Sequence, residues 1–150
     1  MAEWEKREIM DKVSMKEIWS EQELRDVLKL CYDVLGPDLS ELYSYDAWYR
    51  RFLGGREPLV YAQAGDGRVV SAVLGREENK DSLVIGFVAC HKDYRRQGIT
   101  RGLMQYLEGL AREKGYKYIT LGSKEDVFYE ACGYQVIFQV HGQNIYQKVL

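Results

Sequence analysis

The sequence has little of what would mark a metal site or a disulfide framework. There are three cysteines (Cys31, Cys90 and Cys132), which form no CxxC pair, and an odd number does not suit a set of disulfides. Together with His91 and His141 they show no spacing typical of metal ligands. We therefore expect no bound metal, and reduced cysteines in a cytoplasmic protein are the simplest interpretation.

Long apolar runs and an excess of one charge are missing as well. No stretch approaches the roughly 20 apolar residues of a membrane span, and the charged first twelve residues do not resemble a signal peptide. The formal net charge is −2, which gives no general attraction to nucleic acid. We expect neither a membrane nor a nucleic-acid partner, so any anion site must be local.

What is present fits one globular domain. Apolar residues make up 46% and charged residues 29% of the 150 residues, which is an ordinary balance for a folded domain. No internal repeat or low-complexity linker divides the chain. We expect residues 1–13 to form an N-terminal arm or tail and residues 14–150 to form a single domain.

The apolar pattern predicts an α+β (mixed α/β) domain with a mixed sheet. Ser20 and Glu23 form a capping box that predicts the start of the first helix. The nearly continuous apolar run at 82–90 predicts a central strand buried on both faces. The segment from Ser82 to Leu121 predicts a right-handed β-α-β crossover. Strands are predicted at 14–20, 58–64, 68–77, 82–90, 116–122, 135–140 and 144–150, and helices at 20–36, 40–53, 99–114 and 124–133.

The stretch "CHKDYRRQGITRGLM" (90–104) places two arginines, a glutamine and a glycine immediately before a helix. A helix N-terminus carries about half a positive charge and several free N–H groups. Gly98 allows a ligand to approach the backbone, and consecutive amides in such a turn can form an anion nest. With Arg95 and Arg96 beside it, the expected guest is a phosphate or pyrophosphate. The alternative is a plain turn with solvated arginines.

Two stretches resemble motifs of the GNAT superfamily of N-acetyltransferases. "VACHKDYRRQGITRGLM" is similar to the family's acetyl-CoA-binding motif, whose core is R/Q-x-x-G-x-G/A, and "VFYEACGY" is similar to its later F-Y-E-x-x-G-F/Y motif. The helix and strand between them and the order of elements also fit, so the resemblance covers about residues 14–149. It implies a mostly antiparallel central sheet, flanked by about four helices, with one β-α-β crossover.

The resemblance also implies where acetyl-CoA, as co-substrate, would bind. Pantetheine would lie along the strand at 82–90 like an extra β-strand and pair with the backbone of Val88, Ala89 and Cys90. Tyr129 would lie near the CoA sulfur. The pyrophosphate would be held by the backbone amides of Arg95, Arg96, Gln97, Gly98, Ile99 and Thr100.

Three positions depart from the family pattern. Thr100 stands where the motif has Gly or Ala, although its hydroxyl can donate to a phosphate. Gly122 or Ser123 stands where an Asn often follows the fifth strand. The strand at 82–90 lacks the interior Glu that some members use as a base.

Acyl transfer from a thioester requires a neutral amine and a stabilised thiolate. Deprotonating a lysine-like amine at pH 7 costs about 4.6 kcal/mol, whereas an α-amine costs only about 1 kcal/mol. Tyr129 keeps its proton at neutral pH and can donate a hydrogen bond to the thiolate, which makes it the expected general acid. The alternative for Tyr129 is a packing role between the short helix and the sheet.

The base and the acceptor site are less clearly marked. Glu77 and Glu78 at the end of the third strand are candidates for the base, and the alternative is that they are solvated turn charges. The aromatic helix offers Tyr45, Trp48 and Tyr49 as walls of an acceptor site, or as ordinary core and surface residues.

The predicted function is an acetyl-CoA-dependent N-acetyltransferase that acts on a primary amine of a small molecule or a protein. One alternative is a non-catalytic acyl-CoA-binding sensor or interaction module on the same fold, and another is a protein that shares the architecture without binding CoA. The final hairpin (135–150) offers an edge strand through which a homodimer could pair.

Overall fold

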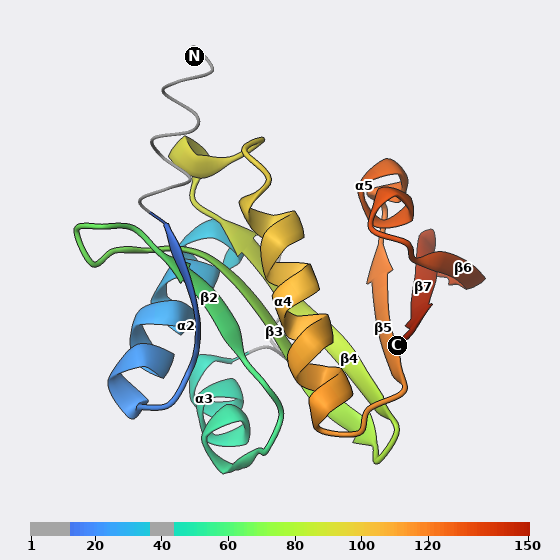
Figure 1. The fold of residues 1–150 in the computed structure, drawn as a ribbon, viewed down its shortest axis with the longest axis horizontal. Coiled ribbons are helices and arrows are strands. Elements are labelled where there is room, and N and C mark those ends of the chain that lie inside the picture. Colours follow the sequence, from blue (N-terminus) through green and yellow to red (C-terminus); the bar gives the residue numbers. More distant parts are fainter. Residues whose placement is uncertain (1–12, 37–43) are drawn as a thin grey trace.

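The fold is built around one mixed sheet. In the computed structural model, which describes residues 13–36 and 44–150, seven strands are arranged in the order β1-β2-β3-β4-β5-β7-β6 (Figure 1). Neighbouring strands are antiparallel except for β4 and β5, which are parallel. The strands are β1 (Ser14–Glu17), β2 (Val60–Gln63), β3 (Val69–Asn79), β4 (Ser82–Cys90), β5 (Tyr118–Ser123), β6 (Gln135–Val140) and β7 (Gln143–Val149). The predicted α+β class and mostly antiparallel sheet are confirmed.

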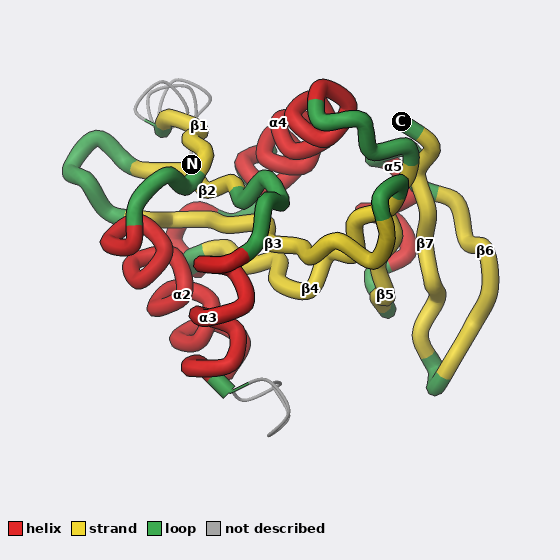
Figure 2. Tube along the Cα trace, turned by 90° about the horizontal axis from the view of Figure 1, so that it is seen from below, coloured by secondary structure: helices red, strands yellow, loops and turns green. Residues whose placement is uncertain are grey.

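Helices cover both faces of this sheet. Figure 2 shows α4 (Ile99–Glu113) on one face, and α2 (Glu21–Leu35) with α3 (Tyr45–Gly54) on the other. The short helix α5 (Asp126–Ala131) lies beside β5 and β7 (Figure 1). Two apolar clusters result, one between α4 and the sheet around Leu103 and Leu107, the other beneath α2 and α3 around Leu28 and Phe87.

Local signals placed the start of α2 and the end of α4 correctly. At the start of α2, Ser20 Oγ accepts a hydrogen bond from the amide of Glu23 at 3.1 Å, and the Glu23 carboxylate accepts one from the amide of Trp19 at 3.2 Å. The bond to Ser20 Oγ confirms the predicted cap, whereas the Glu23 carboxylate reaches the amide of Trp19, one residue before it. Gly115 follows α4 at φ 91°, the left-handed conformation that a glycine after a helix adopts most readily.

Several predicted boundaries differ from the structure. The first strand ends at Glu17 rather than at residue 20, since the chain leaves the sheet before the cap of α2. The first part of the helix predicted at 40–53 lies outside the described residues, as do residues 1–12 of the predicted arm. Within the described chain, α3 begins after Ser44, whose hydroxyl accepts from the amide of Ala47 at 3.3 Å.

The prediction that β4 is buried on both faces is confirmed in part: its side chains reach the apolar clusters on both faces, but only alternate ones are fully buried. Leu74 pairs with Phe87 and Gly75 pairs with Ile85, so Gly86 is an extra residue on β4, a β-bulge. Before the bulge, Ile85 packs in the cluster under α4; after it, Phe87 packs in the cluster under α2 and α3. The bulge therefore changes the face to which the fully buried side chains of β4 point.

The parallel pair β4–β5 is joined over a short stretch only. Ser82 to Val84 pair with Tyr118 to Thr120, after which β5 continues its pairing with β7 and not with β4. The side of β4 that faces β5 is therefore without a strand partner from Ile85 to Cys90 among the described residues. The sheet opens at this place, and the opening holds the candidate site.

The outer edge of the sheet is β6. All six of its residues are exposed, including the apolar Val136, Ile137, Phe138 and Val140. Homodimer formation through this edge stays a prediction. No helix among the described residues is long and apolar enough to cross a membrane.

Candidate active site

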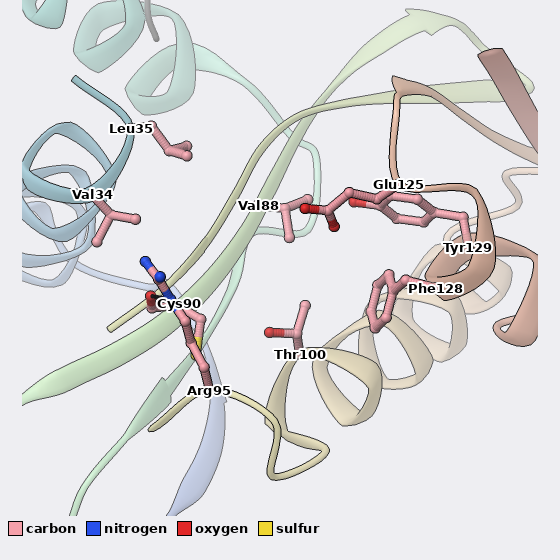
Figure 3. A pocket seen from close by; sticks show the side chains of 9 residues that line it. All are labelled: Val34, Leu35, Val88, Cys90, Arg95, Thr100, Glu125, Phe128 and Tyr129. Atoms are coloured by element: carbon pink, nitrogen blue, oxygen red, sulfur yellow. Dashed lines mark hydrogen bonds between the residues drawn. The ribbon is translucent and has the colours of Figure 1, made fainter. Parts of the chain in front are cut away.

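A cavity of about 370 Å³ occupies the opening between β4 and β5 (Figure 3). Its walls come from distant parts of the chain: Val34 and Leu35 of α2, Val88 and Cys90 of β4, Arg95 of the following turn, Thr100 of α4, and Glu125, Phe128 and Tyr129 at α5. Because α2 and α4 lie on opposite faces of the sheet, the cavity draws on both faces.

A second cavity, of about 220 Å³, adjoins the first at the turn before α4. The two share Cys90, Arg95, Thr100 and Phe128, and the second also includes Arg96 and Gly98. The cavities thus form one continuous region that runs from the N-terminus of α4 to Tyr129.

The turn has the backbone geometry of an anion site. Arg96 and Gly98 have φ of 62° and 80°, so two left-handed residues shape the loop before the helix. No side chain caps α4, and its first backbone bond runs from the amide of Gly102 to the carbonyl of Gly98 at 3.0 Å. The amides of Ile99, Thr100 and Arg101 precede that first bond and are therefore available to a ligand.

The side chains of the turn divide between binding and structural positions. Arg95 Nε donates to the carbonyl of Cys90 at 3.1 Å, and its side chain lines the first cavity. Gln97 does not line either cavity; its Nε2 donates to the carbonyl of Asp93 at 3.3 Å and closes the turn. Ile99 is buried in the core under α4.

The last residues of β4 present different groups. Val88 and Cys90 line the cavity, whereas the side chain of Ala89 is buried beneath α2 and α3. Cys90 is a free thiol whose pKa is raised by burial, against smaller lowering effects of hydrogen bonds from Ser71 and Thr100. It is therefore protonated at neutral pH and adds no charge.

Tyr129 forms the other end of the region. Its side chain is 5% exposed and packs against Phe128, with ring centroids 4.9 Å apart, and against Tyr146. Burial, followed by the nearby charge of Glu125, raises the pKa of Tyr129 to about 12. Tyr129 therefore keeps its proton at neutral pH and can donate a hydrogen bond into the cavity.

A buried ion pair holds α5 in place. Lys148 Nζ of β7 donates to Glu108 Oε1 of α4 at 2.9 Å and to the carbonyl of Cys132 at 2.8 Å, directly after α5. The Tyr134 hydroxyl donates to the other oxygen of Glu108 at 2.9 Å. Glu108 is 3% exposed, so these bonds are shielded from water and fix the position of Tyr129 relative to α4.

The structure does not bring Glu77 or Glu78 to the cavity. Glu77 lies at the far end of β3, where its carboxylate binds Arg56 and accepts a hydrogen bond from Tyr116 at 3.1 Å. Glu78 pairs with Arg76 at 2.6 Å. Both carboxylates have partners of their own, away from Tyr129.

The aromatic residues of α3 are also outside the cavity. Trp48 packs edge-on against Phe87 with ring centroids 5.2 Å apart, and Tyr45 stacks on Tyr49 at 6.1 Å. Arg25 lies over the ring of Tyr49, 5.6 Å from its centroid. These contacts join α3 to α2 and the sheet, and Tyr45 is exposed, which agrees with the alternative that they are ordinary core and surface residues.

Three cavity residues carry no sequence motif: Val34, Leu35 and Glu125. Phe128 belongs to the stretch "VFYEACGY", but no role was predicted for it. A spacing argument would have found Glu125, since it precedes Tyr129 by four residues, the distance that places two side chains on one helix face. No comparable signal exists for Val34 and Leu35, because tertiary packing brings the end of α2 to β4.

Comparison with known proteins agrees with this geometry. Residues 21–134 match the acetyltransferase (GNAT) family. No curated protein matches the sequence significantly.

Solved structures of similar fold cover nearly the whole chain. A putative N-acetyltransferase from Lactobacillus plantarum is 17% identical with a TM-score of 0.75, over 92% of this chain and 98% of that one. A GNAT family acetyltransferase from Elizabethkingia anophelis, with acetyl-CoA bound, is 13% identical with a TM-score of 0.70, over 93% and 99%. The PaiA N-acetyltransferase from Thermoplasma acidophilum, in complex with coenzyme A, is 15% identical with a TM-score of 0.70, over 92% and 99%. With the family match spanning most of its length, the chain belongs to the GNAT family of acetyltransferases.

Proposed function

We propose that this protein is an acetyl-CoA-dependent N-acetyltransferase that transfers an acetyl group to a primary amine. One observation carries the proposal: a continuous cavity joins the uncapped N-terminus of α4 to the Tyr129 side chain through the opening between β4 and β5. The similar structures that hold acetyl-CoA or coenzyme A support the choice of donor.

The donor would be held chiefly by backbone groups. The amides at the start of α4 and the side chain of Arg96 suit the pyrophosphate, since both supply positive charge at the smaller cavity. The unpaired edge of β4 from Val88 to Cys90 suits the amide groups of pantetheine, which would add to the sheet as a strand does. This arrangement directs the thioester toward Tyr129.

The transfer needs little more than positioning and stabilisation of the leaving group. The neutral amine nitrogen attacks the thioester carbonyl, a C–N bond forms and the C–S bond breaks. The sulfur leaves as a thiolate, and the extra proton on nitrogen is lost. The product is an N-acetyl amide, and the thiolate ends as the CoA thiol after taking up a proton.

The high pKa of Tyr129 determines how this residue would assist departure of the CoA thiolate. A pKa of about 12 lies roughly 3.5 units above the reference value of a thiol, so complete proton transfer from Tyr129 to the thiolate would cost about 5 kcal/mol. Tyr129 would therefore act mainly as a hydrogen-bond donor that stabilises the developing thiolate, with solvent supplying the final proton.

The assignment of Glu77 or Glu78 as the general base stays a proposal. Glu77 and Glu78 are engaged elsewhere, so neither can reach an amine at Tyr129 without giving up its partners. An acceptor with a low amine pKa needs no dedicated base, because a useful fraction is already neutral at pH 7.

Calorimetric titration with acetyl-CoA, with free pantetheine as the control, tests the donor assignment. We expect micromolar affinity for acetyl-CoA and much weaker binding of pantetheine. Release of the CoA thiol in the presence of a panel of amines then separates an enzyme from a sensor. Binding without any amine-dependent release would favour a non-catalytic acyl-CoA-binding module, and absence of binding would refute the donor assignment.

A further inference from the structure

The cavity carries two opposite charges at its two ends. Figure 3 shows Arg95 beside Cys90 on one side, and Glu125 beside Tyr129 on the other, facing Val88. Among the described residues that line this cavity, Glu125 is the sole carboxylate and Arg95 the sole cation. A phosphate-bearing donor accounts for the position of Arg95. Nothing in the binding of the donor accounts for a carboxylate next to the reacting sulfur.

Glu125 is not used by the fold. It occupies the position before α5, yet its side chain makes no capping hydrogen bond there. It forms no ion pair or side-chain hydrogen bond with any of the residues that the structure describes; only its backbone amide is engaged, by Ser123 Oγ at 2.9 Å. The carboxylate is near enough to Tyr129 for its charge to raise the pKa of that phenol.

Part of the cavity wall is apolar, beside the polar groups of Arg95, Thr100 and Tyr129. Val34 and Leu35 lie at the end of α2, across from Phe128 and Val88. A single carboxylate in a cavity with one apolar wall suits a ligand with one ammonium group and an aliphatic or aromatic body. A polycation would require several carboxylates, and the described lining offers only one.

We propose that Glu125 binds the ammonium group of the acceptor and selects amines whose hydrocarbon part lies against Val34 and Leu35. This assignment rests on the proposed acetyltransferase function. Glu125 is a positioning and selectivity residue: it places the nitrogen beside the thioester at Tyr129 and takes no part in the bond changes. The ammonium gives up its proton to solvent before the attack, through the open side where Glu125 is exposed.

The test compares Glu125→Gln with Glu130→Gln. Glu130 is an exposed carboxylate of α5 that does not line the cavity. Glu130→Gln therefore removes one negative charge, as Glu125→Gln does, but outside the cavity. The first readout is steady-state turnover of benzylamine and of spermidine at saturating acetyl-CoA. The second is competitive inhibition by benzyltrimethylammonium, a permanent cation that cannot be acetylated. The third is calorimetric binding of acetyl-CoA.

We expect Glu125→Gln to raise the KM for benzylamine about tenfold or more with kcat little changed, and to weaken inhibition by benzyltrimethylammonium by a similar factor. Glu130→Gln should alter neither value, and both variants should bind acetyl-CoA like the wild type. Wild-type kcat/KM should be higher for benzylamine than for spermidine.

The failures of the two proposals are distinguishable. If the wild type acetylates amines but Glu125→Gln matches it in KM and in inhibition, the role of Glu125 is overturned while the acetyltransferase function stands. If the wild type prefers spermidine, the monocationic selectivity is overturned. If the wild type binds acetyl-CoA but acetylates no amine, the proposed function falls and the acceptor role of Glu125 falls with it.

Discussion

The two ends of the cavity are built in different ways. The end at α4 is made, apart from Phe128, by one continuous segment from Cys90 to Arg101, in which Arg96 and Gly98 have positive φ. The end at Tyr129 is assembled from α2, β4 and α5, and depends on the buried pair of Glu108 and Lys148. Substitutions at the first end should therefore change ligand binding alone, whereas substitutions at the second end should also lower the free energy of unfolding.

The largest expected effect is on donor binding at the local end. Gly98→Glu places a carboxylate where the pyrophosphate would lie, and we expect the affinity for acetyl-CoA to fall at least about a hundredfold by calorimetry. Gly67→Glu is a matched control, because Gly67 has a φ of 92° and Gly98 has a φ of 80°, both with open space around a new Cβ. Equal affinities of the two variants would contradict the pyrophosphate assignment.

The assembled end should respond to loss of its ion pair. Lys148→Met leaves the carboxylate of Glu108 buried without its cation, and we expect the free energy of unfolding to fall by about 3 kcal/mol in chemical denaturation. Lys29→Met removes an exposed partner of Asp33 and should cost less than about 1 kcal/mol. Similar losses in both variants would mean that the buried pair has no special part in holding α5.

A substitution at Tyr129 should lower turnover without weakening the binding of acetyl-CoA. Tyr129→Phe should lower kcat about a hundredfold with an almost unchanged dissociation constant for acetyl-CoA, because the hydroxyl contacts only the developing thiolate. The phenol is protonated below its pKa of about 12, so the wild-type rate should show no decline from its ionisation as the pH rises to about 10. Full activity of Tyr129→Phe would reduce Tyr129 to a packing residue.

The smallest expected effect belongs to Arg95. Its guanidinium binds the carbonyl of Cys90, so Arg95→Ala removes both a charge and a support of the turn. We expect about a fivefold loss of affinity for acetyl-CoA and almost none for pantetheine, as measured by calorimetry. Arg96→Ala provides the comparison at the neighbouring cavity. Equal losses for acetyl-CoA and pantetheine would assign Arg95 a purely structural role.

Sequence reasoning predicted the local structure around the candidate site where the signal lay in adjacent residues. The capping box of Ser20 and Glu23, the glycine turn before α4 and the placement of Tyr129 on the short helix after β5 each depend on a few adjacent residues. It did not recover the lining by Glu125, or the engagement of Glu77 by Arg56, which lies 21 residues earlier in the chain. Such contacts are fixed by packing, and no pattern of adjacent residues records them.

By itself the sequence determined the order and type of the elements, because apolar periodicity, caps and turn glycines act over single turns and strands. Only the tertiary structure decided which groups meet. The bulge at Gly86 changes the face to which the buried side chains of β4 point, so Ile85 packs in one apolar cluster and Phe87 in the other. The short pairing of β4 with β5 opens the sheet and admits the end of α2 to the cavity. Both features arise from strand pairing between distant segments. A shift of the register by one residue there would change which side chains face the site.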